Sequence, residues 1–228
     1  MNYILNIETS THICSVALSM NGKTIDLIES FEDKTHAELL TVFIERILKQ
    51  NQIKSKNLSA IAVSEGPGSY TGLRIGISVA KGLCYGLNIP LISIPTLKAM
   101  TEGAIQENKT NSIFCPMIDA RRMEVYTALY TSDLNCIKET HAKIIDTNSF
   151  EELLNQQTIT FFGTGSEKCK SEIKHKHAIF IDKPFVSAQN MSRLSFDKFI
   201  SKNFEDVAYF EPFYLKEFQA IKSTKKYF

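Results

Sequence analysis

The alternation of apolar and polar residues predicts a regular series of strands and helices in the first part of the chain. Asn21-Gly22 separates two such runs and is a strong signal for a two-residue hairpin turn. The predicted elements are, in order, strands at 3–8, 13–20 and 23–30, a helix at 35–50, a strand at 58–65, a glycine-rich loop with a helix, a strand at 90–94 and a helix at 97–107.

The second part of the chain repeats this order. Its predicted elements are strands at 112–120, 124–132 and 136–145, a short helix at 149–156, a strand at 158–165 and a late helix at 187–203. Three strands, a helix, a strand and a helix, occurring twice, predict a duplicated α/β fold. We expect two lobes in contact, 1–104 and 105–228, with the C-terminal segment packing back on the first lobe, because no low-complexity linker separates them.

Composition and charge narrow the class of protein. Hydrophobic residues make up 43% and charged residues 22% of the 228 residues, which is typical of a globular protein. The net charge of +1 provides no general attraction to nucleic acid or to anionic membranes. The five cysteines form no Cys-x-x-Cys pair, which indicates reduced, mostly buried thiols. With no signal peptide and no apolar run of ~20 residues, we expect a cytoplasmic protein that does not contact a membrane.

Five of the ten glycines lie between residues 64 and 83, in "SEGPGSYTGLRIGISVAKGL". This stretch does not fit the phosphate-binding motifs. A P-loop would need a glycine at Thr71 or Leu73, and the dinucleotide fingerprint would need its third glycine one position before Gly72. What remains is a strand, a tight turn and a helix with small residues four positions apart. Such spacing allows a second element to pack very close, either inside the chain or at an interface.

The helix that precedes this stretch favours the interface. Its apolar residues cover more of the helical wheel than a one-sided helix needs, and the glycine helix is similarly apolar. Two neighbouring helices with surplus apolar surface predict a protein–protein contact, with a groove at the glycines facing the preceding helix. The predicted partner-binding residues are Leu39, Leu40, Phe43, Ile47, Gly72, Leu73, Gly76, Val79, Ala80 and Leu83.

Four segments together resemble a known family. The stretch "GPGSYTGLRIGISVAKGL", the N-terminal "ILNIETSTHICSVAL", "HAELL" and "IDARRMEVYTALY" are similar to the TsaB (YeaZ) proteins, bacterial subunits of the machinery that makes threonylcarbamoyladenosine in tRNA. The resemblance covers residues 1 to about 130, and beyond them only "GTG" and "EPFYLKE" fit. It implies the duplicated ASKHA fold of actin and the sugar kinases, in agreement with the order of elements above.

The resemblance also implies a function. A TsaB-like chain would be a non-catalytic partner that forms a heterodimer with TsaD, as needed for transfer of the threonylcarbamoyl group to the tRNA adenosine next to the anticodon. A TsaE-like ATPase would join the complex, the contact with tRNA would be indirect, and the chain alone could form a homodimer. TsaD carries a His-x-x-x-His metal pair where this chain has "PLISIPTLKAM", without histidine. We therefore expect no cofactor here, with ATP and metal on the partner subunits.

Two alternative functions remain open, a glycoprotease-like peptidase and an ATP-binding regulator of the same complex. A peptidase would need a metal or a nucleophile with its base, and neither occurs at a suitable spacing. His175-x-His177 is better explained as an exposed basic loop. The candidate phosphate or nucleotide contacts are Thr9, Ser10 and Thr11 in the first hairpin, which can equally satisfy turn amides, and Arg121 and Arg122 in the corresponding hairpin of the second half.

Overall fold

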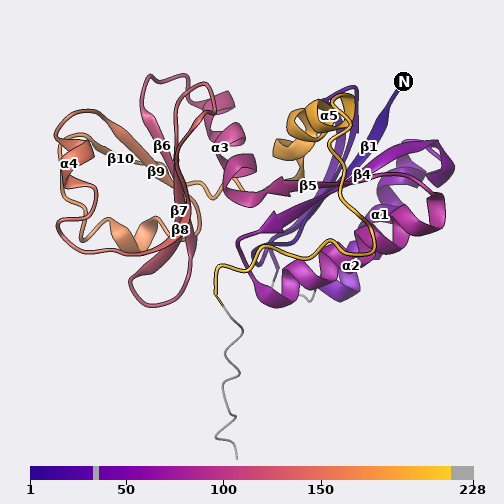
Figure 1. The fold of residues 1–228 in the computed structure, drawn as a ribbon, viewed down its shortest axis with the longest axis horizontal. Helices are drawn as coiled ribbons and strands as arrows, with labels where there is room; N and C mark the ends of the chain where they lie inside the picture. Colours follow the sequence, from indigo (N-terminus) through magenta and orange to yellow (C-terminus); the bar gives the residue numbers. More distant parts are fainter. Residues whose placement is uncertain (33–35, 217–228) are drawn as a thin grey trace, which may run out of the picture.

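The computed structural model describes residues 1–32 and 36–216 and contains two five-stranded sheets (Figure 1). The first sheet has the order β3-β2-β1-β4-β5 and the second the order β10-β9-β6-β7-β8. The strands of the first are β1 (Tyr3–Glu8), β2 (Cys14–Met20), β3 (Lys23–Ser30), β4 (Leu58–Gly66) and β5 (Leu91–Pro95). Those of the second are β6 (Ile113–Asp119), β7 (Glu124–Tyr130), β8 (Cys136–Ile144), β9 (Ile159–Phe162) and β10 (Ala178–Phe180).

Both sheets combine three antiparallel strands with a parallel addition. β1 pairs antiparallel with β2 and parallel with β4, and β6 pairs antiparallel with β7 and parallel with β9. The predicted duplicated α/β fold is therefore confirmed. Between β2 and β3, Asn21 and Gly22 adopt φ values of 50° and 81°, the left-handed conformation that a two-residue hairpin turn requires.

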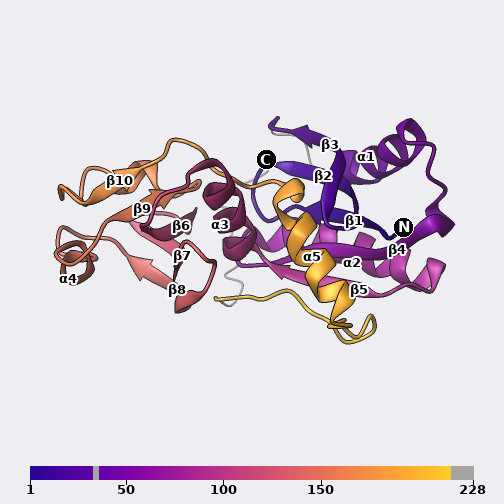
Figure 2. The ribbon, with the colours of Figure 1, turned by 90° about the horizontal axis from the view of Figure 1, so that it is seen from above.

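Helices cover both faces of the first sheet. The helices are α1 (His36–Gln50), α2 (Tyr70–Leu87), α3 (Thr96–Glu107), α4 (Glu151–Leu154) and α5 (Ser192–Ile200), with short 3₁₀ turns η1 (Ser55–Asn57), η2 (Glu167–Cys169) and η3 (Ala188–Met191). Strand alternation sends Leu5 and Ile7 of β1 towards α1 and α2, and Ile4 towards α5. Figures 1 and 2 show α1 and α2 together on one side of this sheet and α5 across the other.

The two lobes meet around α3, which lies between the sheets (Figure 2). Its Leu97 and Met100 pack against Phe114 of the second sheet, whereas Ala99 belongs to the core under α5. The division expected at 104/105 thus falls inside this helix. After α5, the chain runs along the first lobe, where the Glu205 amide donates to the Leu91 carbonyl at 2.9 Å.

Two local predictions differ from the structure, and one strand was not predicted at all. The short helix expected at 149–156 occupies only Glu151–Leu154, and the late helix begins with the 3₁₀ turn η3 before α5. β10 was not predicted, because three residues are too few for an alternation to show. No helix within the described part of the chain is both long and apolar enough to cross a membrane.

Candidate partner-binding face and anion sites

The glycines of α2 lie against the loop that follows β1. A Cβ atom at Gly72 would stand 2.1 Å from the Thr9 carbonyl oxygen, and one at Gly76 would stand 2.2 Å from Thr9 Oγ1. At Gly68 it would stand 2.2 Å from the Ser10 carbonyl oxygen. The predicted groove at Gly72 and Gly76 is therefore filled by Thr9 of the same chain. A Cβ at Gly72 would also stand 3.2 Å from His36 Cδ2, in the first residue of α1, so the preceding helix does lie beside this glycine. The expectation of a groove left open for a partner is wrong, because Thr9 occupies it and the two glycines serve internal packing.

Hydrogen bonds hold this contact in place. Thr9 Oγ1 donates to the Gly72 carbonyl oxygen at 2.8 Å, and the Ser69 amide donates to the Ser10 carbonyl oxygen at 2.6 Å. Ser69 also caps α2, since its Oγ accepts from the Gly72 amide at 3.2 Å. The glycine turn is thereby fastened to the end of β1.

A buried carboxyl group lies under the same loop. Glu8 Oε1 accepts from the Ser10 amide at 2.6 Å and from Ser64 Oγ at 2.9 Å. Burial raises the pKa of Glu8, although these hydrogen bonds act in the opposite direction. The side chains of Thr9, Ser10 and Thr11 are buried too, and the Thr11 carbonyl lies 2.7 Å from His36 Nε2. This geometry does not support the phosphate contact predicted for Thr9, Ser10 and Thr11.

Most of the predicted partner-binding residues point into the lobe. Leu40, Ile47, Leu73 and Ala80 have no exposed surface and Phe43 is 9% exposed. All of them except Leu73 belong to the core cluster beneath the first sheet. For these five, direct contact with a partner is corrected to a role in the core. A helical wheel shows how much of a helix is apolar, but it does not show which apolar side the sheet covers.

Five apolar residues of α1 and α2 keep part of their surface exposed to solvent. Leu39, Val79 and Leu83 are half-buried, as is Ile75, and Val42 is 55% exposed. We call these five residues the helix-pair face. Ile75 and Val42 were not among the predicted partner-binding residues, although both are apolar residues of these two helices.

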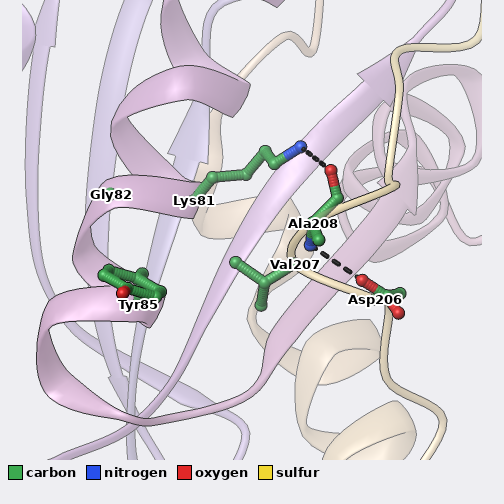
Figure 3. Close-up of a pocket in the computed structure, with 6 residues that line it drawn as sticks. All are labelled: Lys81, Gly82, Tyr85, Asp206, Val207 and Ala208. Carbon is green, nitrogen blue, oxygen red and sulfur yellow. Dashed lines mark hydrogen bonds between the residues drawn. The ribbon is translucent and has the colours of Figure 1, made fainter.

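A shallow hollow lies between the C-terminal half of α2 and the segment Asp206, Val207 and Ala208 (Figure 3). Lys81 Nζ donates to the Ala208 and Phe210 carbonyl oxygens at 3.0 and 3.1 Å, which fastens the C-terminal segment to the helix. Tyr85 is 87% exposed beside the hollow, and a Cβ at Gly82 would meet no atom within 4 Å. The segment that joins α2 across more than a hundred residues could not be located from sequence.

The two predicted arginines lie in the other lobe, in the β6–β7 hairpin. Arg121 and Arg122 are exposed and have φ values of 70° and 49°. The Arg121 amide donates to Asp119 Oδ1 at 2.8 Å. Lys168 Nζ contacts Asp119 Oδ1 at 2.5 Å and the carbonyl oxygens of Arg122 and Glu124 at 2.6 and 2.7 Å. Sequence reasoning did not identify Lys168, which holds the turn from 44 to 49 residues away.

Groups that could carry metal or thiol chemistry are scarce among the described residues. No three His, Cys, Asp or Glu side chains of 1–32 and 36–216 gather as a metal site. His175 Nδ1 accepts from the His177 amide at 3.2 Å, and His177 Nδ1 lies 2.8 Å from the Leu154 carbonyl oxygen. Burial raises the pKa of Cys14 to about 11 and that of Cys115 to about 12. That the chain binds no metal or cofactor of its own stays a prediction.

Comparison with known sequences identifies the family. A sequence profile of TsaD, tRNA N6-adenosine threonylcarbamoyltransferase, matches residues 30–222. The tRNA threonylcarbamoyladenosine biosynthesis protein TsaB of Escherichia coli is 32% identical over 226 residues, which cover 96% of each chain. This chain belongs to the TsaB family. The TsaD of Bacillus subtilis is 32% identical over only 108 residues, 40% of this chain and 31% of that protein. The pairwise match to TsaB thus spans nearly the whole of both proteins, whereas the pairwise match to the transferase covers less than a third of that protein, although the TsaD profile spans most of this chain.

Solved structures agree on the fold. YeaZ from Pseudomonas aeruginosa superposes with a TM-score of 0.83 at 23% identity, covering 94% of this chain and all of that one. The activator of 2-hydroxyisocaproyl-CoA dehydratase from Clostridium difficile, solved with bound ADPNP, gives a TM-score of 0.52 at 7% identity, over 88% of this chain and 97% of that one. The ASKHA fold implied by the sequence resemblance is confirmed.

Proposed function

We propose that this chain is a non-catalytic partner subunit in the synthesis of threonylcarbamoyladenosine in tRNA. It forms a heterodimer with a TsaD-like protein through the helix-pair face, and this pairing is needed for transfer of the threonylcarbamoyl group to the tRNA adenosine next to the anticodon. ATP and metal belong to the partner subunits, which include a TsaE-like ATPase. In the absence of TsaD the same face pairs two copies of this chain.

The observation that carries this proposal is the apolar surface that α1 and α2 leave partly exposed, with Leu39, Ile75, Val79 and Leu83 half-buried against the core. Val42 of α1 is 55% exposed, and Tyr85, near the end of α2, is 87% exposed. An apolar strip with polar surroundings is a common site of protein–protein contact. The pairwise match to TsaB covers 96% of each chain, whereas that to the Bacillus subtilis transferase covers 31% of that protein, which supports a partner role rather than the transferase role.

The thiol chemistry of the chain argues against a cysteine peptidase. Burial raises the pKa of Cys84 to about 12 and that of Cys169 to about 11, so both thiols are protonated at neutral pH. A nucleophilic cysteine requires the opposite shift. The ATP-binding regulator is disfavoured by the loop after β1, whose hydroxyl groups are buried.

The test compares two substitutions of an exposed apolar residue by glutamate. Val42→Glu places a charge in the helix-pair face, and Ile144→Glu makes the same kind of change at a 70% exposed residue of β8 in the other lobe. A charge buried at an apolar interface should weaken binding of the TsaD-like protein at least tenfold, about 1.4 kcal/mol, in isothermal titration calorimetry. Ile144→Glu should leave it unchanged.

Activity assays test the non-catalytic role. Threonylcarbamoyl transfer to unmodified tRNA should require this chain together with TsaD and should fall with Val42→Glu in proportion to the lost binding. Transfer by this chain alone would contradict the proposal. Equal affinity of the wild type and Val42→Glu for TsaD would instead show that another surface forms the heterodimer.

A further inference from the structure

Two arginines at the tip of the β6–β7 hairpin have no acidic partner in the described structure. The two carboxylates of this hairpin already form ion pairs with lysines. Asp119 pairs with Lys168, and Glu124 pairs with Lys216. None of the ion pairs found within 1–32 and 36–216 involves Arg121 or Arg122. The hairpin therefore carries two exposed guanidinium groups whose charge no nearby carboxylate balances.

The backbone of this turn makes the choice of arginine unusual. Arg121 and Arg122 both have positive φ, a conformation that costs an ordinary residue about 1–2 kcal/mol. Where the first lobe needs two such residues in succession, at the β2–β3 turn, it uses Asn21 and Gly22, which adopt the conformation readily. Two arginines kept at strained positions on the surface point to a function for their side chains.

Lys168 stabilises the strained turn from below. Its ammonium group binds the carbonyl oxygens of Arg122 and Glu124 and the Asp119 carboxylate, and its side chain is only 23% exposed. One cation thus satisfies the inward acceptors of the hairpin. The side chains of both arginines are exposed, while Lys168 holds the backbone of the turn in place. A binding loop needs such a rigid backbone.

The C-terminal segment brings a further lysine to the same place. Lys216 pairs with Glu124 at the start of β7, and twelve more residues come after it in the sequence. Their sequence, "EFQAIKSTKKYF", contains three lysines and one glutamate. The sequence that continues from the hairpin contact is therefore basic, in a chain whose net charge is only +1.

We propose that the β6–β7 hairpin binds backbone phosphates of the tRNA substrate through Arg121 and Arg122. The identification of the RNA rests on the proposed function. The hairpin offers charge without an apolar centre, since Ala120 and Met123 are half-buried and its exposed residues are polar. A surface of this kind suits a polyanion better than a protein interface, which normally has an apolar core.

Salt dependence of RNA binding provides the test. The full-length chain is titrated into fluorescently labelled, unmodified tRNA, and the anisotropy is followed between about 50 and 200 mM salt. Each phosphate contact contributes about 0.7–0.9 to the slope of log K against log salt concentration. The double variant Arg121→Gln/Arg122→Gln should therefore lower the slope by about 1.4–1.8 and weaken binding about tenfold at the lower salt concentration.

Two further double variants serve as controls. Lys54→Gln/Lys56→Gln removes two exposed charges at the far edge of the first lobe and should leave the slope unchanged. Arg121→Lys/Arg122→Lys keeps the charge and should keep most of the slope, because a phosphate accepts a point charge. Unchanged thermal unfolding shows that each variant is folded.

Several outcomes would overturn the proposal. These are no salt-dependent binding by the wild type, the same loss in the Lys54/Lys56 control, or no loss in the arginine double variant. If that variant binds tRNA normally but binds the TsaD-like protein more weakly, the arginines contact a protein carboxylate. The proposed function is tested separately. It fails if the wild-type chain does not bind the TsaD-like protein.

Discussion

The loop after the first strand is buried in one lobe and exposed in the other, although both sheets have the same strand order. After β1, Thr9 and Ser10 are fully buried against the glycines that begin α2. After β6, Arg121 and Arg122 stand on the surface above Lys168. The first loop contributes to packing, and the second displays charge.

The difference comes from the helical element after the fourth strand of each sheet. Both lobes place a glycine turn against the end of the first strand, since a Cβ at Gly68 would meet Ser10 and one at Gly165 would stand 2.9 Å from the Asp119 amide nitrogen. In the first lobe this turn leads into α2, with 18 residues, and in the second into η2, with three. A long helix covers the adjacent loop, and a single 3₁₀ turn does not.

The largest effect should come from filling the close contact in the first lobe. Gly72→Ala places a Cβ atom 2.1 Å from the Thr9 carbonyl oxygen, a backbone atom that cannot rotate away. We expect it to lower the free energy of unfolding by about 2–3 kcal/mol. Gly82→Ala, on the same helix in open space, should raise it by about 0.5–1 kcal/mol. Chemical denaturation measures both, and equal values would show that the contact with Thr9 is not rigid.

Removal of the lysine under the second hairpin should have the next largest effect. Lys168→Met keeps the aliphatic stem but leaves the carbonyl oxygens of Arg122 and Glu124 without their donor. We expect a loss of about 1–2 kcal/mol in thermal or chemical unfolding. Lys174→Met, at an exposed position of the same lobe, is the control and should stay within about 0.5 kcal/mol of wild type. A neutral Lys168→Met would mean that the hairpin holds its shape unaided.

The buried carboxyl of the first lobe should make stability depend on pH. Burial raises the pKa of Glu8 in the folded state, so the folded chain binds more protons than the unfolded one and stability falls as the pH rises above 4.5 towards the raised value. Glu8→Gln should remove this contribution, so the stability of the variant should fall less than that of the wild type between pH 4 and pH 7.5. Glu45→Gln, an exposed change, serves as control, and parallel pH profiles for all three proteins would contradict the assignment.

The smallest effect is expected where the C-terminal segment joins the two lobes. The Tyr214 ring packs against the Tyr70 ring at a tilt of 31°, with 4.8 Å between the centroids, and Lys216 then pairs with Glu124. The Lys216 side chain is 48% exposed, so Glu124→Gln should cost less than about 1 kcal/mol, measured by thermal unfolding. The difference from wild type should vanish at about 1 M salt, where surface pairs are screened. A larger loss that persists in salt would show that the pair holds the lobes together.

Sequence reasoning succeeded where the signal is local. β1 and β3 begin and end where their alternation does, and Asn21-Gly22 forms the predicted turn. The spacing of Gly72 and Gly76 also predicted that another element packs very close. The spacing could not show which element this is, because Thr9 lies 63 residues from Gly72 in the sequence. Contacts between distant segments also explain why Leu40 was wrongly predicted to bind a partner and why Lys168 was not identified.

Order and periodicity along the chain determined the duplicated fold, the apolar character of α1 and α2, and the presence of two arginines in a tight turn. These depend on neighbours two to four residues apart, which the sequence displays directly. Only the tertiary structure decided which apolar side meets the sheet, which loop fills the glycine helix and which charges stay unpaired. Each of these depends on contacts between segments far apart in the chain, such as Lys168 with Asp119, and the sequence contains such residues without bringing them together.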